Sequence, residues 1–199
     1  MEDLFKEYKL AAMERLQKAK EDKEVDEDAV PFLDIINSHP RYFTSSSCYG
    51  RINVIYLPTK SKKDSDFVGK WHRKVSFEEV KKVIENSQPP LWFKMEPYII
   101  HITCCSIDDA ANLLELKQKL GQKRGGIFSL KNNRIQIELE GTNRMEVPVK
   151  TDNFQIDDNY LRILIDLANV RFEKNQNVWE SLKSAFQKIG TESNDNQEK

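Results

Sequence analysis

The chain has 199 residues, of which 32% are charged, and its formal net charge at pH 7 is -1. This length suits one domain with a substantial core, and the near-zero charge argues against indiscriminate nucleic-acid binding without excluding a local basic patch. Because it has no apolar run long enough to cross a bilayer and no signal peptide, we expect a cytoplasmic protein without a membrane partner. The three cysteines show no spacing typical of a disulfide framework or a metal site.

The N-terminal part of the chain predicts two helices, a polar bend and a strand. Apolar residues at helical spacing predict a helix over 3–20, and Asp26 is a suitable cap for a second helix that ends near Ser38. The hydroxyl-rich stretch 44–51 is typical of a turn. The β-branched and aromatic run 52–57 predicts a strand, so the bend would lie at the mouth of that strand.

The next part of the chain predicts strands around one helix. A polar loop is expected at 58–66 and a short strand at 70–75. Ser76 and Glu79 have the spacing of a capping box, which predicts a helix over 77–86. Two further strands are expected after the Pro-Pro break, at 91–95 and 98–103.

A third helical pattern, three strands and a long helix complete the chain. An apolar face predicts a helix over 107–121. The strands expected after the following Gly-Lys loop are 127–130, 134–139 and 145–149. Asp157 or Asp158 caps the last helix, for which the polar stretch 175–177 is a candidate break, and fraying is expected after Ile189.

Strands in clusters, without regular βαβ alternation, predict an α+β fold with mostly antiparallel pairing. The segments starting at Arg51 and Arg134 look like counterparts, which suggests an internal duplication. We therefore expect a single domain over residues 1–189 and a polar tail over 190–199. The duplicated halves would be residues 20–105 and 106–189.

Basic residues gather in two segments that bracket the centre of the chain. Residues 60–74 contain six bases and two acids, and residues 117–134 contain six bases and no acid. Residues 21–34 are acidic by contrast. Such segments either contact nucleic acid or form ordinary solvated surface, and both interpretations stay open on composition alone.

The order of residues around the bend is more informative than their types. The segment Tyr42-Phe-Thr-Ser-Ser-Ser-Cys-Tyr-Gly-Arg-Ile52 resembles the Y-F-T-T-S-S-C-S-G-R-I signature of the wybutosine-synthesising tRNA methyltransferase family, which includes archaeal wyosine-derivative N-4 methyltransferases. Further similar segments are Lys70-Trp-His72, Leu91 to His101, Glu146-Val-Pro148 and Tyr160 to Asn169. The resemblance covers roughly residues 5–185.

This resemblance implies a fold, a reaction and a substrate. It implies two related β/α repeats that share one curved, barrel-like sheet with helices outside. The methyl donor would be S-adenosylmethionine, no metal would be needed, and the partner would be tRNA(Phe). The acceptor would be a ring nitrogen of a tricyclic guanosine derivative that lies next to the anticodon and carries an amino-carboxypropyl arm.

The resemblance also implies roles for residues in the matched segments. The residues expected to bind the donor are Thr44, Ser45, Ser46, Ser47 and Gly50. The residues expected to contact tRNA are Lys70, Trp71 and Arg73 of a matched segment, together with Lys123 and Arg124, which belong to the second basic segment. The alternative for the first set is a structural turn, and for the second a solvated surface.

Three further residues are the candidate catalytic groups. Arg51 would hold a carboxylate of the donor or acceptor, unless it forms an ion pair with Asp26 or Glu27. His72 and His101 are candidate general bases, because an imidazole removes a proton near neutral pH. His101 lies in an apolar strand and reads more readily as a core histidine, so His72 is preferred.

Two other functions remain open. The chain departs from the family pattern at Tyr49, Cys105, Arg124-Gly125 and Glu140, so a catalytically inactive, tRNA-binding paralogue of the same fold is the main alternative. A hydrolase that uses the Ser/Cys cluster is disfavoured, because the sequence shows no evident nucleophile–base–acid order.

Overall fold

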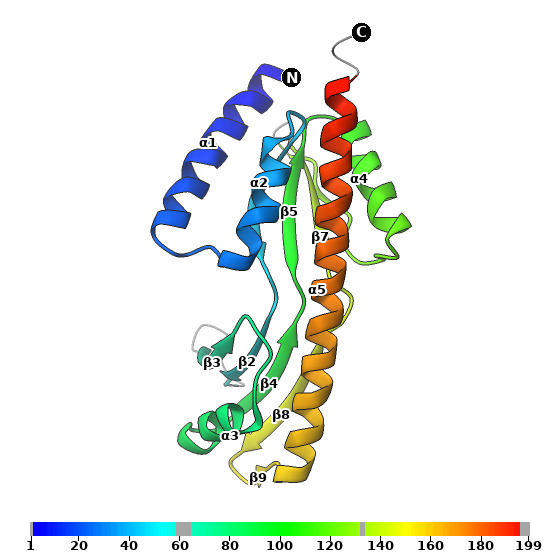
Figure 1. The fold of residues 1–199 in the computed structure, drawn as a ribbon. Helices are drawn as coiled ribbons and strands as arrows, with labels where there is room; N and C mark the ends of the chain where they lie inside the picture. The colour runs from blue at the N-terminus through cyan, green and yellow to red at the C-terminus, as the bar shows by residue number, and fades with distance from the viewer. Residues whose placement is uncertain (1, 59–64, 132–133, 196–199) are drawn as a thin grey trace. The chain divides into compact units, whose positions relative to one another are not determined.

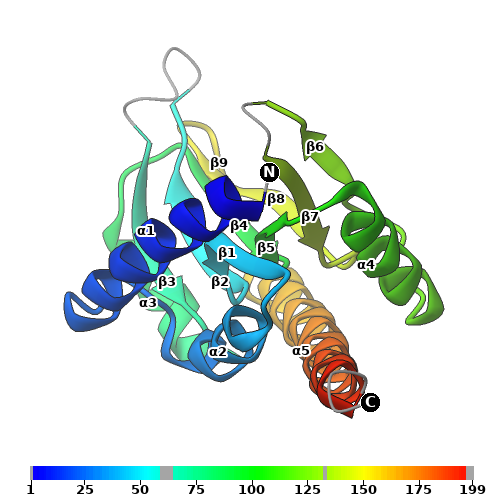
Figure 2. The same ribbon diagram turned by 90° about the horizontal axis from the view of Figure 1, so that it is seen from above.

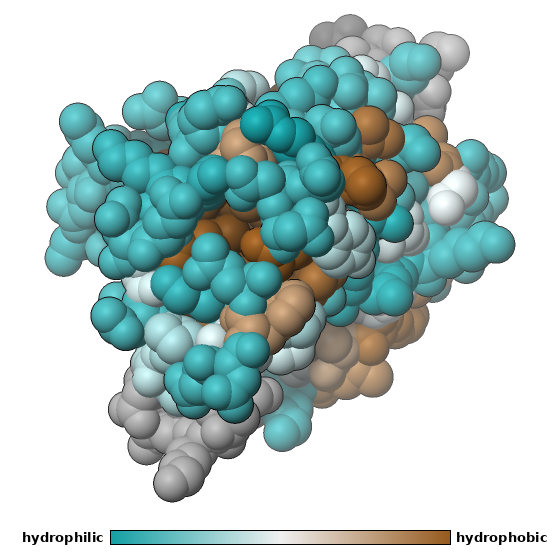
Figure 3. All heavy atoms as spheres, turned by 90° about the horizontal axis from the view of Figure 1, so that it is seen from below, coloured by the Kyte–Doolittle hydropathy of each residue, from teal (hydrophilic) through white to brown (hydrophobic). Residues whose placement is uncertain are grey.

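The computed structural model describes residues 2–58, 65–131 and 134–195, and the chain forms two compact units (Figure 1). Unit 1 comprises Met1–Tyr49, Tyr98–Thr142 and Asn177–Lys199, and unit 2 comprises Gly50–Pro97 and Asn143–Gln176. No helix within the described ranges combines the length and apolarity that a membrane span requires. The face drawn in Figure 3 is mostly hydrophilic, with separate hydrophobic patches.

Unit 1 is built on a four-stranded antiparallel sheet with the order β1-β5-β7-β6. Its strands are β1 (Tyr42–Cys48), β5 (Ile99–Cys104), β7 (Ile135–Glu140) and β6 (Ile127–Ser129). Its helices are α1 (Glu2–Glu21), the 3-10 turn η1 (Glu27–Ala29), α2 (Val30–Ser38), α4 (Ile107–Lys119) and the C-terminal part of α5 (Asp158–Asp195). Figure 2 views this sheet from above, with α1 next to β1 and α4 next to β7.

The core of unit 1 follows from the two-residue repeat of its strands. Ile100 and Ile102 of β5 and Ile137 of β7 are fully buried in one apolar cluster, because alternate side chains of a strand point to the same face. Trp179 of α5 is the largest fully buried side chain there. Its ring lies 5.1 to 5.5 Å, centroid to centroid, from the rings of Phe32, Tyr49 and Tyr98.

Unit 2 is built on a five-stranded antiparallel sheet with the order β3-β2-β4-β8-β9. Its elements are β2 (Arg51–Tyr56), β3 (Asp66–Trp71), α3 (Phe77–Asn86), β4 (Leu91–Glu96), β8 (Met145–Thr151), β9 (Phe154–Gln155) and the N-terminal part of α5. The predicted capping box at Ser76 and Glu79 is confirmed, with both reciprocal hydrogen bonds present. Asn169 of α5 holds the start of α3 by bonding both the N–H and the C=O of Val75.

The α+β class with antiparallel pairing is confirmed, and the sheet arrangement differs from the expectation. The hydrogen-bonded strands form two open sheets among the described residues, where one shared, barrel-like sheet was expected. Each unit draws segments from both of the predicted halves, so the duplication of 20–105 and 106–189, and the single-domain boundaries 1–189, remain predictions.

Several predicted elements need correction. The stretch Thr44 to Ser47, expected as a bend, belongs to strand β1, because its backbone N–H and C=O groups pair with those of β5. The strand expected at 70–75 is β3, which begins at Asp66 and ends at Trp71. Most of the predicted 58–66 loop, residues 59–64, lies outside the described residues. Helix α5 runs without a break at 175–177 and continues past Ile189 to Asp195.

His39 makes the stability of unit 1 depend on pH. Its ring is buried, stacks on Tyr42 at 4.7 Å and accepts the Arg41 N–H at Nδ1. Burial, followed by the nearby Lys9 ammonium, lowers the His39 pKa below its ordinary 6.5, while Asp109 opposes this shift. Because the unfolded chain binds the proton first, the stabilisation is present above pH 6.5 and is lost as pH falls through the folded-state pKa.

We therefore expect the free energy of unfolding to fall between pH 7.5 and pH 5.5, and to fall less in His39→Gln. Urea unfolding at the two pH values measures both drops. An equal drop in the wild type and the variant would assign the pH dependence to other groups.

Candidate functional site

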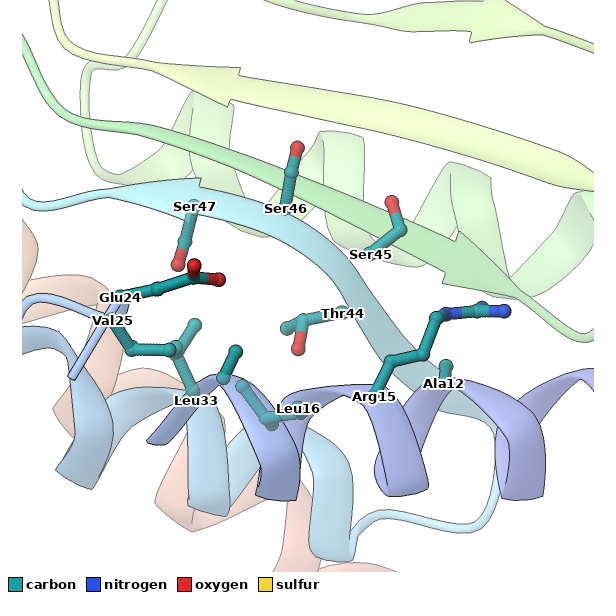
Figure 4. Close-up of a pocket in the computed structure, with 11 residues that line it drawn as sticks. Ala12, Arg15, Leu16, Glu24, Val25, Leu33, Thr44, Ser45, Ser46 and Ser47 are labelled. Atoms are coloured by element: carbon teal, nitrogen blue, oxygen red, sulfur yellow. The ribbon is translucent and has the colours of Figure 1, made fainter. Parts of the chain in front are cut away.

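The hydroxyl-rich strand lines a pocket in unit 1 (Figure 4). Its volume is about 270 Å³. The lining residues come from α1, the segment after it, α2 and β1: Ala12, Arg15, Leu16, Ala19, Glu24, Val25, Leu33, Thr44, Ser45, Ser46 and Ser47. The pocket thus combines apolar walls, hydroxyl groups and two side chains of opposite charge, Arg15 and Glu24.

The four hydroxyl residues do not all face this pocket. Thr44 and Ser47 point toward it, whereas the hydroxyls of Ser45 and Ser46 point away (Figure 4). A β-bulge between Thr44 and Ser46 inserts an extra residue and changes which side chains share a face. The donor-binding set expected from sequence is therefore divided between the two sides of β1.

Thr44 is fixed by helix α2. Asn37 accepts the Thr44 N–H at 2.8 Å, and its Nδ2 donates to Thr44 Oγ1 at 2.9 Å. Thr44 is buried, so these bonds satisfy polar groups that water does not reach. We conclude that Thr44 anchors the pocket wall, while Ser47 presents its hydroxyl to the pocket.

Ser46, His101 and Glu138 form a hydrogen-bonded chain across three neighbouring strands. Ser46 Oγ lies 2.8 Å from His101 Nδ1, and His101 Nε2 lies 2.8 Å from Glu138 Oε2. The register places Ser46 opposite His101 on β5 and His101 opposite Glu138 on β7. The exposed Phe128 ring of β6 lies 4.6 Å from the imidazole, centroid to centroid.

The hydrogen-bonded Ser46–His101–Glu138 chain lies on the face of the sheet opposite the main apolar cluster of unit 1. The neighbours Ile100 and Ile102 are fully buried, so His101 points to the opposite face. Its side chain is 28% exposed and that of Glu138 is 31% exposed. The interpretation of His101 as a core histidine is therefore wrong, because strand alternation turns it out of the apolar cluster.

The order of the three hydrogen-bonded side chains fixes which atom donates and which accepts. An ionised Glu138 only accepts, so His101 donates from Nε2 and keeps Nδ1 as an acceptor. Ser46 then donates its hydroxyl proton to Nδ1 and presents an oxygen at an exposed position. This order of hydrogen bonds is the one that a proton transfer from Ser46 to the imidazole requires, with the carboxylate of Glu138 beside the ring that would become charged.

Arg51 of unit 2 pairs with a residue that sequence reasoning did not select. Its Nε donates to Glu96 Oε2 at 2.5 Å, and Asn53 Nδ2 donates to the same oxygen at 3.0 Å. The guanidinium lies over the Phe67 ring, 4.7 Å from its centroid. Glu96 thus takes the place that the sequence assigned to Asp26 or Glu27, and Asp26 accepts the Tyr49 N–H instead.

His72 follows strand β3, and its ring is partly buried. Its Nδ1 lies 3.1 Å from the carbonyl oxygen of Gly50, which only accepts, so Nδ1 carries a proton and Nε2 is the basic nitrogen of the neutral ring. Gly50 has a φ of 95°, which favours glycine. Its observed contact is with His72, and its predicted role toward the donor stays a prediction.

The residues expected to contact tRNA occur in both units. Lys70 and Arg73 of unit 2 are exposed and Trp71 is partly buried, and Arg73 is paired with Glu79 at 2.6 Å. Lys123 and Arg124 of unit 1 are exposed. Their loop is held from beneath, because the ammonium of Lys117 donates to the carbonyl oxygens of Arg124 and Gly125. Burial lowers the Lys117 pKa.

Within each unit the structure brings together part of the predicted set. In unit 1 it joins Ser46 to His101 and places Thr44 and Ser47 at one pocket. In unit 2 it joins Gly50 to His72. Sequence reasoning missed Glu138, Glu96 and Asn53 as partners, and a correct strand register was the only signal that could have found them.

Known proteins resemble this chain over nearly its whole length. The sequence pattern of the family described as Methyltransferase TYW3 matches residues 6–188. A Thermococcus kodakarensis protein named tRNA(Phe) 7-((3-amino-3-carboxypropyl)-4-demethylwyosine(37)-N(4))-methyltransferase 1 is 36% identical over 188 residues, which are 93% of this chain and 95% of that protein. A Methanocaldococcus jannaschii protein named as the corresponding methyltransferase is 32% identical over 178 residues, covering 87% and 92%.

A solved structure has the same fold. The PH1069 protein from Pyrococcus horikoshii superposes with a TM-score of 0.88 and 32% sequence identity. The superposition covers 93% of this chain and 97% of that one.

Proposed function

The chain belongs to the methyltransferase TYW3 family, and we propose that it transfers a methyl group from S-adenosylmethionine to N4 of 7-(3-amino-3-carboxypropyl)-4-demethylwyosine at position 37 of tRNA(Phe). The observation that carries this proposal is the 36% identity over 93% of the chain to a protein named for this reaction. We place this reaction in the cytoplasm.

Two of the residues that depart from the family pattern, Tyr49 and Cys105, have structural roles. The Tyr49 ring packs edge-on against Trp179 in the core, and Cys105 packs against the apolar cluster of Phe5, Ala12 and Phe43. None of these departures lies in the Ser46–His101–Glu138 chain. The inactive paralogue therefore gains no support from these positions.

The pocket of unit 1 suits part of the methyl donor. S-adenosylmethionine joins an adenosine to a positively charged sulfonium that carries an α-amino-acid chain, and the pocket offers the Ser47 hydroxyl, apolar walls and the charges of Arg15 and Glu24. Its 270 Å³ lie just below the roughly 300–1,000 Å³ usual for small-molecule sites. We propose that this pocket takes one end of the donor and not the whole molecule.

When bound, the donor supplies an electrophilic methyl group, so the protein must orient the acceptor nitrogen and remove its proton. We propose that Ser46 and His101 remove this proton, which moves to His101 Nδ1 while Glu138 stabilises the imidazolium. The exposed Phe128 ring beside the imidazole offers a surface on which a flat base can stack.

For the RNA itself we propose the cationic residues of both units as contacts. Lys123 and Arg124 would neutralise phosphates from the loop of unit 1, and Lys70 and Arg73 would do so from unit 2. Trp71 would stack on a base. These roles rest on exposure and charge.

Mass spectrometry of tRNA(Phe) tests the proposed function. We expect incubation of the protein with S-adenosylmethionine and tRNA that carries the armed 4-demethyl base to add one methyl group to that nucleoside. Control tRNA with unmodified guanosine at position 37 should gain none. If the armed tRNA and the donor both bind but no methyl group is transferred, the proposed reaction is wrong.

A further inference from the structure

Three polar residues of unit 2 form a second binding site, and this inference rests on the proposed function. We infer that Arg51, Asn53 and Glu96, hereafter the unit 2 cluster, bind the zwitterionic α-amino-acid group of a ligand. Glu96 holds its ammonium and Arg51 holds its carboxylate. In the proposed reaction both the donor and the arm of the acceptor base carry such a group, so the chemistry is shared and the source is left to the experiment.

Glu96 has capacity to bind a cation. Its Oε2 receives both hydrogen bonds of the cluster, from Arg51 Nε and from Asn53 Nδ2. Among the described residues no hydrogen bond to Oε1 is found, so this oxygen has unused acceptor positions. The side chains of Arg51 and Glu96 are 27% and 31% exposed, so a ligand reaches them from solvent.

Asn53 supplies an independent sign that the cluster is incomplete. It is fully buried, and its Oδ1 has no hydrogen-bond partner among the described residues. The amide cannot be turned around, because its oxygen would then face the Glu96 carboxylate. A buried hydrogen-bond acceptor without a partner costs stability. The unused acceptor oxygens of Glu96 and Asn53 therefore favour the binding of a cationic group that donates hydrogen bonds, such as an ammonium.

Arg51 is prepared to bind a carboxylate. The guanidinium group lies over the Phe67 ring. Only its Nε donates a hydrogen bond to Glu96. Among the described residues no hydrogen bond from either terminal Nη is found, so both remain for a two-pronged contact with an anion.

The arrangement selects the zwitterion over simpler ions. A free phosphate would be repelled by Glu96, and a metal or organic cation would be repelled by Arg51, since the two groups lie in direct contact. An α-amino acid places one positive and one negative group two bonds apart, so each meets its opposite. The inorganic ions and the zwitterion can therefore be distinguished by binding alone.

The donor source is tested by calorimetric titration with S-adenosylhomocysteine and with 5'-methylthioadenosine, which lacks the amino-acid group. The variants are Glu96→Gln and Arg51→Gln, and the matched controls are Lys74→Gln and Glu173→Gln, which remove the charges of an exposed ion pair in the same unit. If the cluster binds the donor, both cluster variants lower the affinity for S-adenosylhomocysteine by at least about tenfold. The affinity for methylthioadenosine stays unchanged.

The acceptor source is tested by tRNA binding with the same variants. If the cluster binds the amino-carboxypropyl arm, the variants lower the affinity for armed tRNA by at least about tenfold. Their affinities for tRNA with arm-free 4-demethylwyosine and for S-adenosylhomocysteine stay unchanged. Asn53→Ala should weaken binding of the same ligand that Glu96→Gln weakens. Far-UV circular dichroism of each variant identifies loss of fold, and Arg51→Lys replaces any variant that unfolds.

Two results would overturn the inference: unchanged affinity for all four ligands, or equal weakening of ligands with and without the amino-acid group. These measurements involve no methyl transfer. Failure of the proposed reaction and failure of the unit 2 cluster are therefore separate results.

Discussion

Replacing His101 by glutamine is expected to lower kcat of methyl transfer by about 10²–10⁴-fold, the usual contribution of a general base. Glutamine keeps the size and polarity of the side chain but cannot take up a proton. The Ser46 hydroxyl would lose its acceptor at 2.8 Å, and Glu138 would have no imidazolium to stabilise. Single-turnover measurement with saturating donor separates this loss from any change in binding.

Two further variants make the His101 result specific. Glu138→Gln should give a smaller loss, because a neutral amide stabilises the imidazolium less than a carboxylate does. His39→Gln should transfer the methyl group at the wild-type rate at pH 8, since His39 is buried beside Tyr42 and outside the chain. Full activity in His101→Gln would assign the proton to another group, with His72 the next candidate.

Replacing Trp179 by alanine is expected to lower the free energy of unfolding by about 3–5 kcal/mol. Trp179 is 0% exposed and contacts the rings of Phe32, Tyr49 and Tyr98, so truncation leaves a cavity among rigid neighbours. Single domains are stable by only about 5–15 kcal/mol, so this change would remove a large part of the total. Urea unfolding at pH 7.5 measures it.

The matched variants are Trp179→Phe and Tyr160→Ala. Phenylalanine keeps most of the apolar contact and removes the buried indole N–H, which has no partner among the described residues, so its cost should be well below that of alanine. Tyr160 lies on the same helix but is 47% exposed, and its loss should change stability by less than about 0.5 kcal/mol. A Trp179→Ala variant as stable as Tyr160→Ala would contradict the packing described for unit 1.

Local chemistry in the sequence was enough to place most of the elements. The capping box at Ser76 located the start of α3 because its two hydrogen bonds join residues only three apart. The β-branched run after Arg51 located β2 because isoleucine and valine favour the extended backbone of a strand. The family was also evident from several short motifs in the right order, and the match over residues 6–188 confirms it.

The same local reasoning misread the hydroxyl run. Serine and threonine in sequence favour a turn, because their side chains bond the nearby backbone. In the folded chain β5 supplies that backbone with partners from residues more than fifty positions away, so Thr44 to Ser47 form a strand. Whether such a segment is a bend or a strand depends on a neighbour that composition does not reveal.

The sequence by itself determined the family and the α+β class. It also predicted the side chains that carry chemistry, among them Arg51, His72, His101 and the serines of β1, and these roles stay predictions. Only the tertiary structure decided their partners. Ser46 and His101 are 55 positions apart, His101 and Glu138 are 37 apart, and Arg51 and Glu96 are 45 apart. Each pair meets because strand register joins distant segments, and register is set by burial of the opposite faces of the sheets rather than by the polar residues themselves.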